Sequence, residues 1–110
     1  MQVIATRLFV TLVLVGLLFP SSVLAHRVNI FAYIDGGMVY VESYFPDGSP
    51  VVAGKIQVRD SAGKLLLKAV TDSEGLFDFP VPKRDDLTLF LDAGMGHRNS
   101  FLLKKTTMDE

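Results

Sequence analysis

Residues 27–45 read RVNIFAYIDGGMVYVESYF, and this stretch decides the fold class. On both sides of the Asp-Gly-Gly triplet at 35–37, apolar residues alternate with polar or aromatic ones. Alternation with a period of two is typical of a strand with one buried face. Asp and Gly tolerate the positive φ that a tight hairpin turn requires. The stretch therefore predicts two antiparallel strands, 27–34 and 38–45, joined by a hairpin.

The alternation also assigns a face to each residue of this hairpin. Two mainly apolar sets are predicted to point inward: Val28, Ile30, Ala32 and Ile34 from the first strand, and Val39, Val41 and Ser43 from the second. Tyr33, Tyr40 and Tyr44 then fall on the outer face. Three tyrosines there are a candidate docking patch, and simple cross-strand packing is the alternative.

Five further strands follow from the same period and from the Gly, Pro, Asp and Ser clusters that separate them: 55–59, 64–70, 76–81, 87–92 and 99–104. Strand aromatics usually lie in the core, so we expect Phe77, Phe79, Phe90 and Phe101 there. Short strands at a spacing of about 8–12 residues predict an all-β fold. We expect a seven-stranded antiparallel β-sandwich of immunoglobulin or prealbumin type over residues 26–105, with 106–110 as a frayed tail.

The first 25 residues have the organisation of a secretory signal peptide. Arg7 precedes an apolar run, Leu8–Phe19, and Val23-Leu24-Ala25 places small residues at the cleavage site. The run would form about 18 Å of helix, against a hydrocarbon core of about 30 Å. Cleavage after Ala25 would make His26 the first residue of a secreted or periplasmic protein. The alternative is an uncleaved segment that holds the domain at a membrane.

The composition of the mature chain excludes several classes of function. Removing residues 1–25 leaves 110 − 25 = 85 residues and takes away Arg7, so 10 Lys and Arg stand against 12 Asp and Glu. This net charge of −2 argues against nucleic-acid binding. There is no Cys, hence no disulfide and no thiolate chemistry. No serine lies in a G-x-S-x-G nucleophile motif, so we expect neither an enzyme nor a small-molecule substrate.

The acidic residues are expected to stabilise turns, because most lie in turn sequences: Asp47, Asp60, Asp72, Asp85 and Asp86. Asp72 and Glu74 beside Gly75 provide too few oxygen ligands for calcium.

The two histidines are the candidate site. As the first residue, His26 would offer its α-amine and ring Nδ1, which together close a six-membered chelate. His97 lies in the loop before the last predicted strand, and up-and-down strands bring that loop to the end where the first strand starts. Three nitrogen donors suit Ni, Co, Cu or Zn. Met95 and Asp92 are possible additional ligands. The alternative is that His97 is an ordinary surface residue.

Two stretches resemble known families. TDSEGLFDF, residues 71–79, resembles the turn and strand of carboxypeptidase regulatory-like, prealbumin-type sandwiches. AHRVNIFA at 25–32 together with AGMGH at 93–97 resembles the small extracytoplasmic component of nickel/cobalt transporters of the energy-coupling-factor class. VYVES at 39–43 and GKIQV at 54–58 also match.

The second resemblance implies an accessory protein of nickel or cobalt uptake, with His26 and His97 as metal contacts and membrane components of a transporter as partners. Members of that family often continue into a C-terminal membrane helix after this strand. Here Lys104-Lys105 follows the strand instead. We therefore expect a free periplasmic form, or one held by an uncleaved N-terminal segment.

Two other functions compete with nickel or cobalt handling. One is a copper carrier that also begins with histidine; only Met38, Met95 and Met108 remain for Cu(I), whereas Cu(II) stays possible. The other is an adhesion or scaffold module in which the histidines are incidental.

Overall fold

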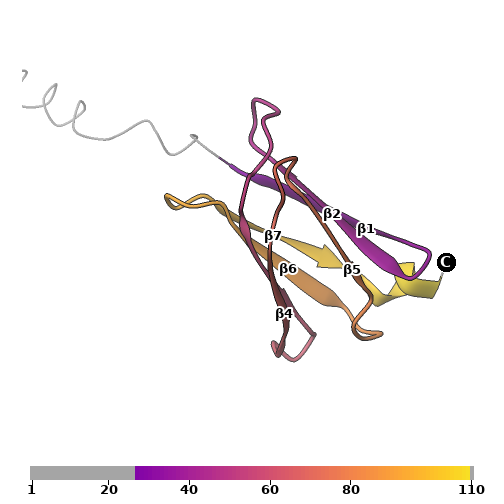
Figure 1. The fold of residues 1–110 in the computed structure, drawn as a ribbon. Helices are drawn as coiled ribbons and strands as arrows, with labels where there is room; N and C mark the ends of the chain where they lie inside the picture. The colour runs from indigo at the N-terminus through magenta and orange to yellow at the C-terminus, as the bar shows by residue number, and fades with distance from the viewer. Residues whose placement is uncertain (1–26, 110) are drawn as a thin grey trace, which may run out of the picture.

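The computed structural model describes residues 27–109 (Figure 1). The predicted signal peptide and His26 therefore lie outside the described residues. Within them, seven strands form two antiparallel sheets, and no α-helix is present. The all-β prediction is confirmed. Each strand begins and ends within two residues of its predicted limits.

One sheet has the strand order β1-β2-β5, with bounds Asn29–Asp35, Met38–Tyr44 and Leu76–Pro80. The other has the order β4-β3-β6-β7, with bounds Leu65–Val70, Lys55–Arg59, Leu87–Asp92 and Arg98–Leu103. The first hairpin has the predicted register, since Tyr33 pairs with Tyr40 and Asp35 with Met38. The two sheets lie next to each other at β1 and β7, where the rings of Phe31 and Phe101 are 5.5 Å apart.

Both sheets contribute to one hydrophobic core. Its buried side chains come from alternate positions of the strands, and from Val51 in the loop after β2: Val28, Ile30, Ala32, Val39, Val41, Val51, Ile56, Val58, Phe79, Leu87, Leu89, Leu91 and Leu103. Full burial of one such aliphatic side chain contributes about 1.5–3 kcal/mol. The inward faces predicted for the first hairpin are confirmed, including the buried Ser43.

Two predictions of packing differ from the structure. Phe79 is buried, and Phe77 and Phe101 pack against the core, but Phe90 is 43% exposed. The reason is the period of the strand: Leu89 and Leu91 point inward, so the residue between them must point outward. The tail was expected to fray, yet Lys105–Asp109 form the 3-10 helix η2, and Met108 packs against the core.

The described part of the chain has no helix that is long and apolar enough to cross a membrane.

Candidate functional site

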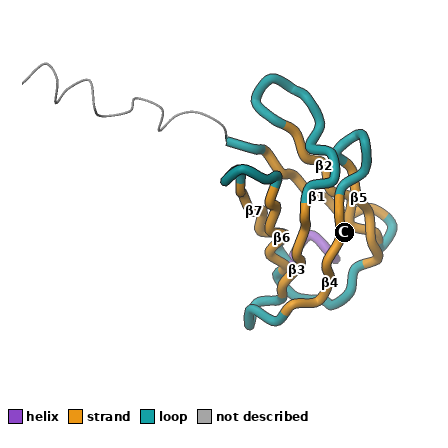
Figure 2. The backbone as a smooth tube through the Cα atoms, turned by 60° about the vertical axis from the view of Figure 1, so that its left-hand side comes forward, coloured by secondary structure: helices purple, strands orange, loops and turns teal. Residues whose placement is uncertain are grey.

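Four segments lie at one end of the molecule: the start of β1, the 45–54 loop, the 71–75 turn and the 93–97 loop. Figure 1 shows them at the end where the described chain begins, and Figure 2 shows the same loops from another side. The prediction that strand alternation would bring the 93–97 loop to the start of β1 is confirmed for the described residues.

Two of these segments are joined by buried hydrogen bonds. The Thr71 hydroxyl donates to the Val51 carbonyl at 2.5 Å and accepts from the Gly54 N–H at 2.8 Å. The Gly75 carbonyl accepts from both the N–H and the hydroxyl of Ser43, at 2.9 and 2.8 Å. A buried polar group is stabilising only when it has such partners. The 45–54 loop and the 71–75 turn therefore form one rigid unit on the end of β2.

The 93–97 loop is closed by backbone hydrogen bonds within its own hairpin. The Ala93 N–H donates to the His97 carbonyl at 2.8 Å, and the His97 N–H donates to the Gly94 carbonyl at 2.9 Å. Gly94, Met95 and Gly96 all have positive φ, at 87°, 54° and 81°. Glycine adopts that region at no steric cost, so the two glycines on either side of Met95 make the tight reversal possible.

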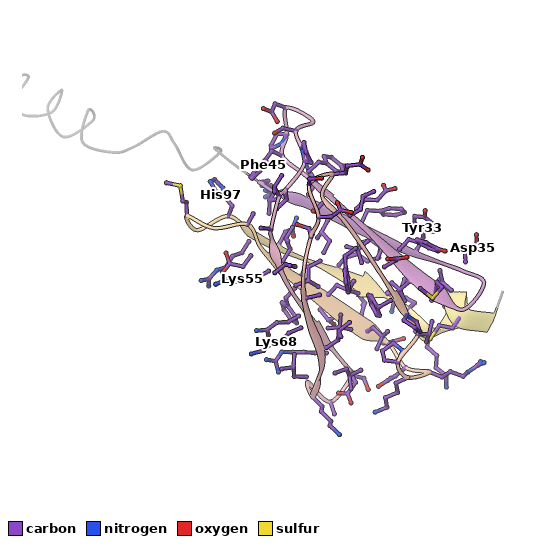
Figure 3. The ribbon with its side chains drawn as sticks, viewed as in Figure 1. Tyr33, Asp35, Phe45, Lys55, Lys68 and His97 are labelled. Carbon is purple, nitrogen blue, oxygen red and sulfur yellow. The ribbon has the colours of Figure 1, made fainter. Side chains whose placement is uncertain are left out.

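Each predicted site residue in this loop has a distinct environment. His97 is half-buried, and its ring makes a T-shaped contact with the Phe45 ring at a centroid distance of 5.9 Å (Figure 3). Met95 is 98% exposed. The Asp92 carboxylate accepts from the Gly94 N–H at 2.9 Å and lies 3.6 Å from Arg98 Nε. Asp92 therefore stabilises the loop.

The start of β1 lies beside the strand that follows His97. Asn99 Nδ2 donates to the Val28 carbonyl at 2.8 Å. Arg27, the first described residue, therefore directly precedes a residue that is hydrogen-bonded to β7. In the sequence, His97 lies two residues before Asn99, just as position 26 lies two residues before Val28. His26 itself lies outside the described residues.

Residues 27–109 contain no cluster of three or more His, Cys, Asp or Glu side chains that could hold a metal. Within that range, the nitrogen donor predicted for a transition metal is the His97 imidazole. The other predicted nitrogen donors, the α-amine and ring of His26, belong to a residue outside the described range.

The titrating groups with clear shifts lie in turns, in agreement with the structural role expected for the acids. The hydrogen bond from Lys83 holds the pKa of the Asp60 carboxyl below its ordinary value, and the same bond raises the pKa of Lys83. The Lys83 Nζ and Asp60 Oδ2 atoms are 2.9 Å apart. Their segments, the β3–β4 turn and the β5–β6 connection, lie at the end opposite the 93–97 loop (Figure 1). Hydrogen bonds from Ser61 and Ser49 likewise lower the pKa of Asp85 and of Asp47.

Sequence reasoning missed two residues that shape this end of the molecule. Phe45 continues the inward alternation of Val41 and Ser43, and that pattern could have indicated that it would pack at this end. Asn99 was placed in a strand, but nothing in the sequence indicates its hydrogen bond to a carbonyl 71 residues away.

Comparisons of the chain with protein-family models, with curated proteins and with solved structures find no match.

Proposed function

We propose that the protein is a periplasmic metal-binding accessory protein of nickel or cobalt uptake. Cleavage after Ala25 would leave His26 as the first residue, and its α-amine and ring Nδ1 would bind one divalent ion together with the His97 imidazole. The domain would be a seven-stranded sandwich of immunoglobulin or prealbumin type, and its partners would be membrane components of a metal transporter. The metal is the cargo of this protein.

The observation that carries the proposal is the hydrogen bond from Asn99 to the Val28 carbonyl, 2.8 Å long. It fixes the first residues of β1 against the strand that His97 precedes. The described chain begins at the end of the molecule where the 93–97 loop lies (Figure 1). Since residue 26 is bonded to Arg27, the proposal places His26 near that loop. The half-buried His97 ring, packed on Phe45, gives one donor a defined position.

The chemistry of this donor set supports a transition metal. Amine and imidazole nitrogens suit Ni, Co, Cu and Zn, whereas Ca and Mg prefer oxygen. Three protein donors leave coordination positions for water, which suits an ion that must be passed on. Copper(II) binds such sites more tightly than nickel under equal conditions, so affinity alone does not identify the physiological ion.

The test begins with mass spectrometry of the exported protein, which should show His26 as the first residue. Calorimetry with Ni²⁺ and Cu²⁺ then compares three proteins: the cleaved form, a form with one residue added before His26, and His97→Ala. The added residue converts the amine to an amide and breaks the chelate, so we expect it to weaken binding more than His97→Ala does.

The pH dependence of binding provides a second readout. A free α-amine has a pKa of about 7.7–8.0, so the metal must displace its proton. Affinity should rise between about pH 6 and 8, with release of protons on binding. Equal binding by all three proteins would contradict the proposal and favour the scaffold function.

A further inference from the structure

The outer faces of the two sheets carry opposite charge. Strands β1, β2 and β5 contain Asp35, Glu42 and Asp78 and no Lys or Arg. Strands β3, β4, β6 and β7 contain Lys55, Arg59, Lys68 and Arg98 against one acid, Asp92. The formal charges are therefore −3 and 4 − 1 = +3. Figure 3 shows Tyr33 and Asp35 on one side of the molecule and Lys55 and Lys68 on the other.

The acidic face is also aromatic. The rings of Tyr33 and Tyr40 stack at a centroid distance of 5.3 Å. Tyr33 and Tyr40 are cross-strand partners, and Tyr40 pairs on its other side with Asp78. Two residues along the same face, Phe31 pairs with Glu42. Phe31 and Tyr33 are exposed, at 45% and 41%. Exposed aromatic rings among carboxylates attract Lys and Arg side chains through both charge and cation–π interactions.

The basic face has the complementary arrangement. Over β3, β6 and β7 it forms an open groove of about 590 Å³ whose lining includes Lys55, Phe90 and Arg98. Phe90 pairs with Gln57, which pairs in turn with Lys68. The exposed Phe90 ring therefore lies among cations. On the acidic face, by contrast, the exposed aromatic rings lie among carboxylates.

From this complementarity we infer that the acidic aromatic face of one copy of this chain docks on the basic groove of a second copy. Such a contact is heterologous, because the two partners use different surfaces. Each dimer keeps one free face of each kind, so association continues as the concentration rises. The attraction is electrostatic and lies at the surface, so salt should weaken it.

The test uses protein expressed as the complete chain and purified in EDTA, which makes the result independent of metal binding. Sedimentation velocity is measured over a range of concentrations at about 20 mM and about 500 mM NaCl, which span weak and strong screening. We expect concentration-dependent association at low salt and at least about tenfold weaker association at high salt.

Charge reversal identifies the surfaces. Glu42→Lys/Asp78→Lys and Lys55→Glu/Lys68→Glu should each abolish self-association, and an equimolar mixture of the two should restore it. Lys104→Glu/Lys105→Glu is the matched control for the basic-face variant, because it makes the same change of net charge outside the sheets and should associate as the wild type does. Far-UV circular dichroism establishes that each variant is folded.

Four results would overturn the inference. The first is a monomer at every concentration in low salt, and the second is association that strengthens with salt, which indicates apolar contact. The third is loss of association in the control variant. Sedimentation of the monomer with vesicles of anionic lipid, lost in Lys55→Glu/Lys68→Glu, would instead make a lipid surface the occupant of the basic face and would also overturn it.

Discussion

The 71–75 turn and the 93–97 loop lie at the same end of the molecule, but they are held in different ways. The turn is tied to other parts of the chain through Ser43, Val51 and Gly54, in part by buried side chains. The loop is closed by its own backbone hydrogen bonds and exposes Met95 to solvent. Binding residues are commonly found on exposed loops that a rigid scaffold positions. The difference therefore separates the part of this end that maintains the fold from the part that is available for binding.

Among these substitutions, Gly75→Ala in the 71–75 turn should have the largest effect on the free energy of unfolding. Gly75 has φ +77°, and a Cβ there would collide with the Ser43 carbonyl oxygen. Gly75→Ala should reduce the free energy of unfolding by about 3 kcal/mol, since it combines backbone strain with a steric clash. Urea unfolding measures the loss.

Gly96→Ala is the matched control in the exposed loop. Its φ is +81°, but a Cβ there would have no atom within 4 Å. Strain alone should cost about 1–2 kcal/mol. Equal losses of unfolding free energy in the two variants would show that the 71–75 turn can move to avoid the clash. That result would remove the proposed difference between the turn and the 93–97 loop.

Thr71→Val should have the next largest effect. The substitution keeps the shape of the side chain but leaves the Val51 carbonyl and the Gly54 N–H without their hydroxyl partner. A loss of about 1–3 kcal/mol is expected for buried groups left in this way. Ser49→Ala removes an exposed hydroxyl that bonds Asp47 and should change stability little in the same unfolding experiment. An unchanged free energy of unfolding in Thr71→Val would contradict the view that the 45–54 loop and the 71–75 turn form one rigid unit.

A smaller and pH-dependent effect is expected at the opposite end. Asp60 is buried and paired with Lys83, which lowers the pKa of its carboxyl from the ordinary 3.8. Because the folded pKa is the lower one, the stabilisation is complete above 3.8 and is lost as the pH falls through the folded value. Asp60→Asn should therefore lower the melting temperature at pH 7, and its difference from wild type should shrink in acid. A difference independent of pH would assign the effect to packing instead.

The smallest effect should be that of Met95→Ala. The side chain is 98% exposed, so its removal should change the free energy of unfolding by less than about 0.5 kcal/mol. Thermal unfolding is sufficient to detect a larger change. A clear loss would mean that Met95 packs in solution, and the loop would then be less available for binding.

The sequence predicted the strands well because each has a period of two and ends in turn residues. The same period should have placed Phe90 outside, and the general preference of strand aromatics for the core led to the wrong expectation. The hydrogen bonds between Thr71 and the 45–54 loop were not predictable, because they join residues that are 17 and 20 positions apart in the sequence. For the candidate site, the position of the His97 loop at the start of β1 followed from strand alternation. The contact with Phe45 did not follow, because it depends on side-chain packing between two loops.

Paramagnetic broadening by Cu²⁺ tests the proposed metal site most directly. Substoichiometric Cu²⁺ is added to the ¹⁵N-labelled exported protein, and amide signals are followed by NMR. The account predicts selective loss of signals from Arg27, Val28, Phe45 and residues 94–98, because these surround the proposed ion. Broadening centred on the acidic turns near Asp60 or Asp72, with the signals of residues 94–98 unaffected, would contradict it.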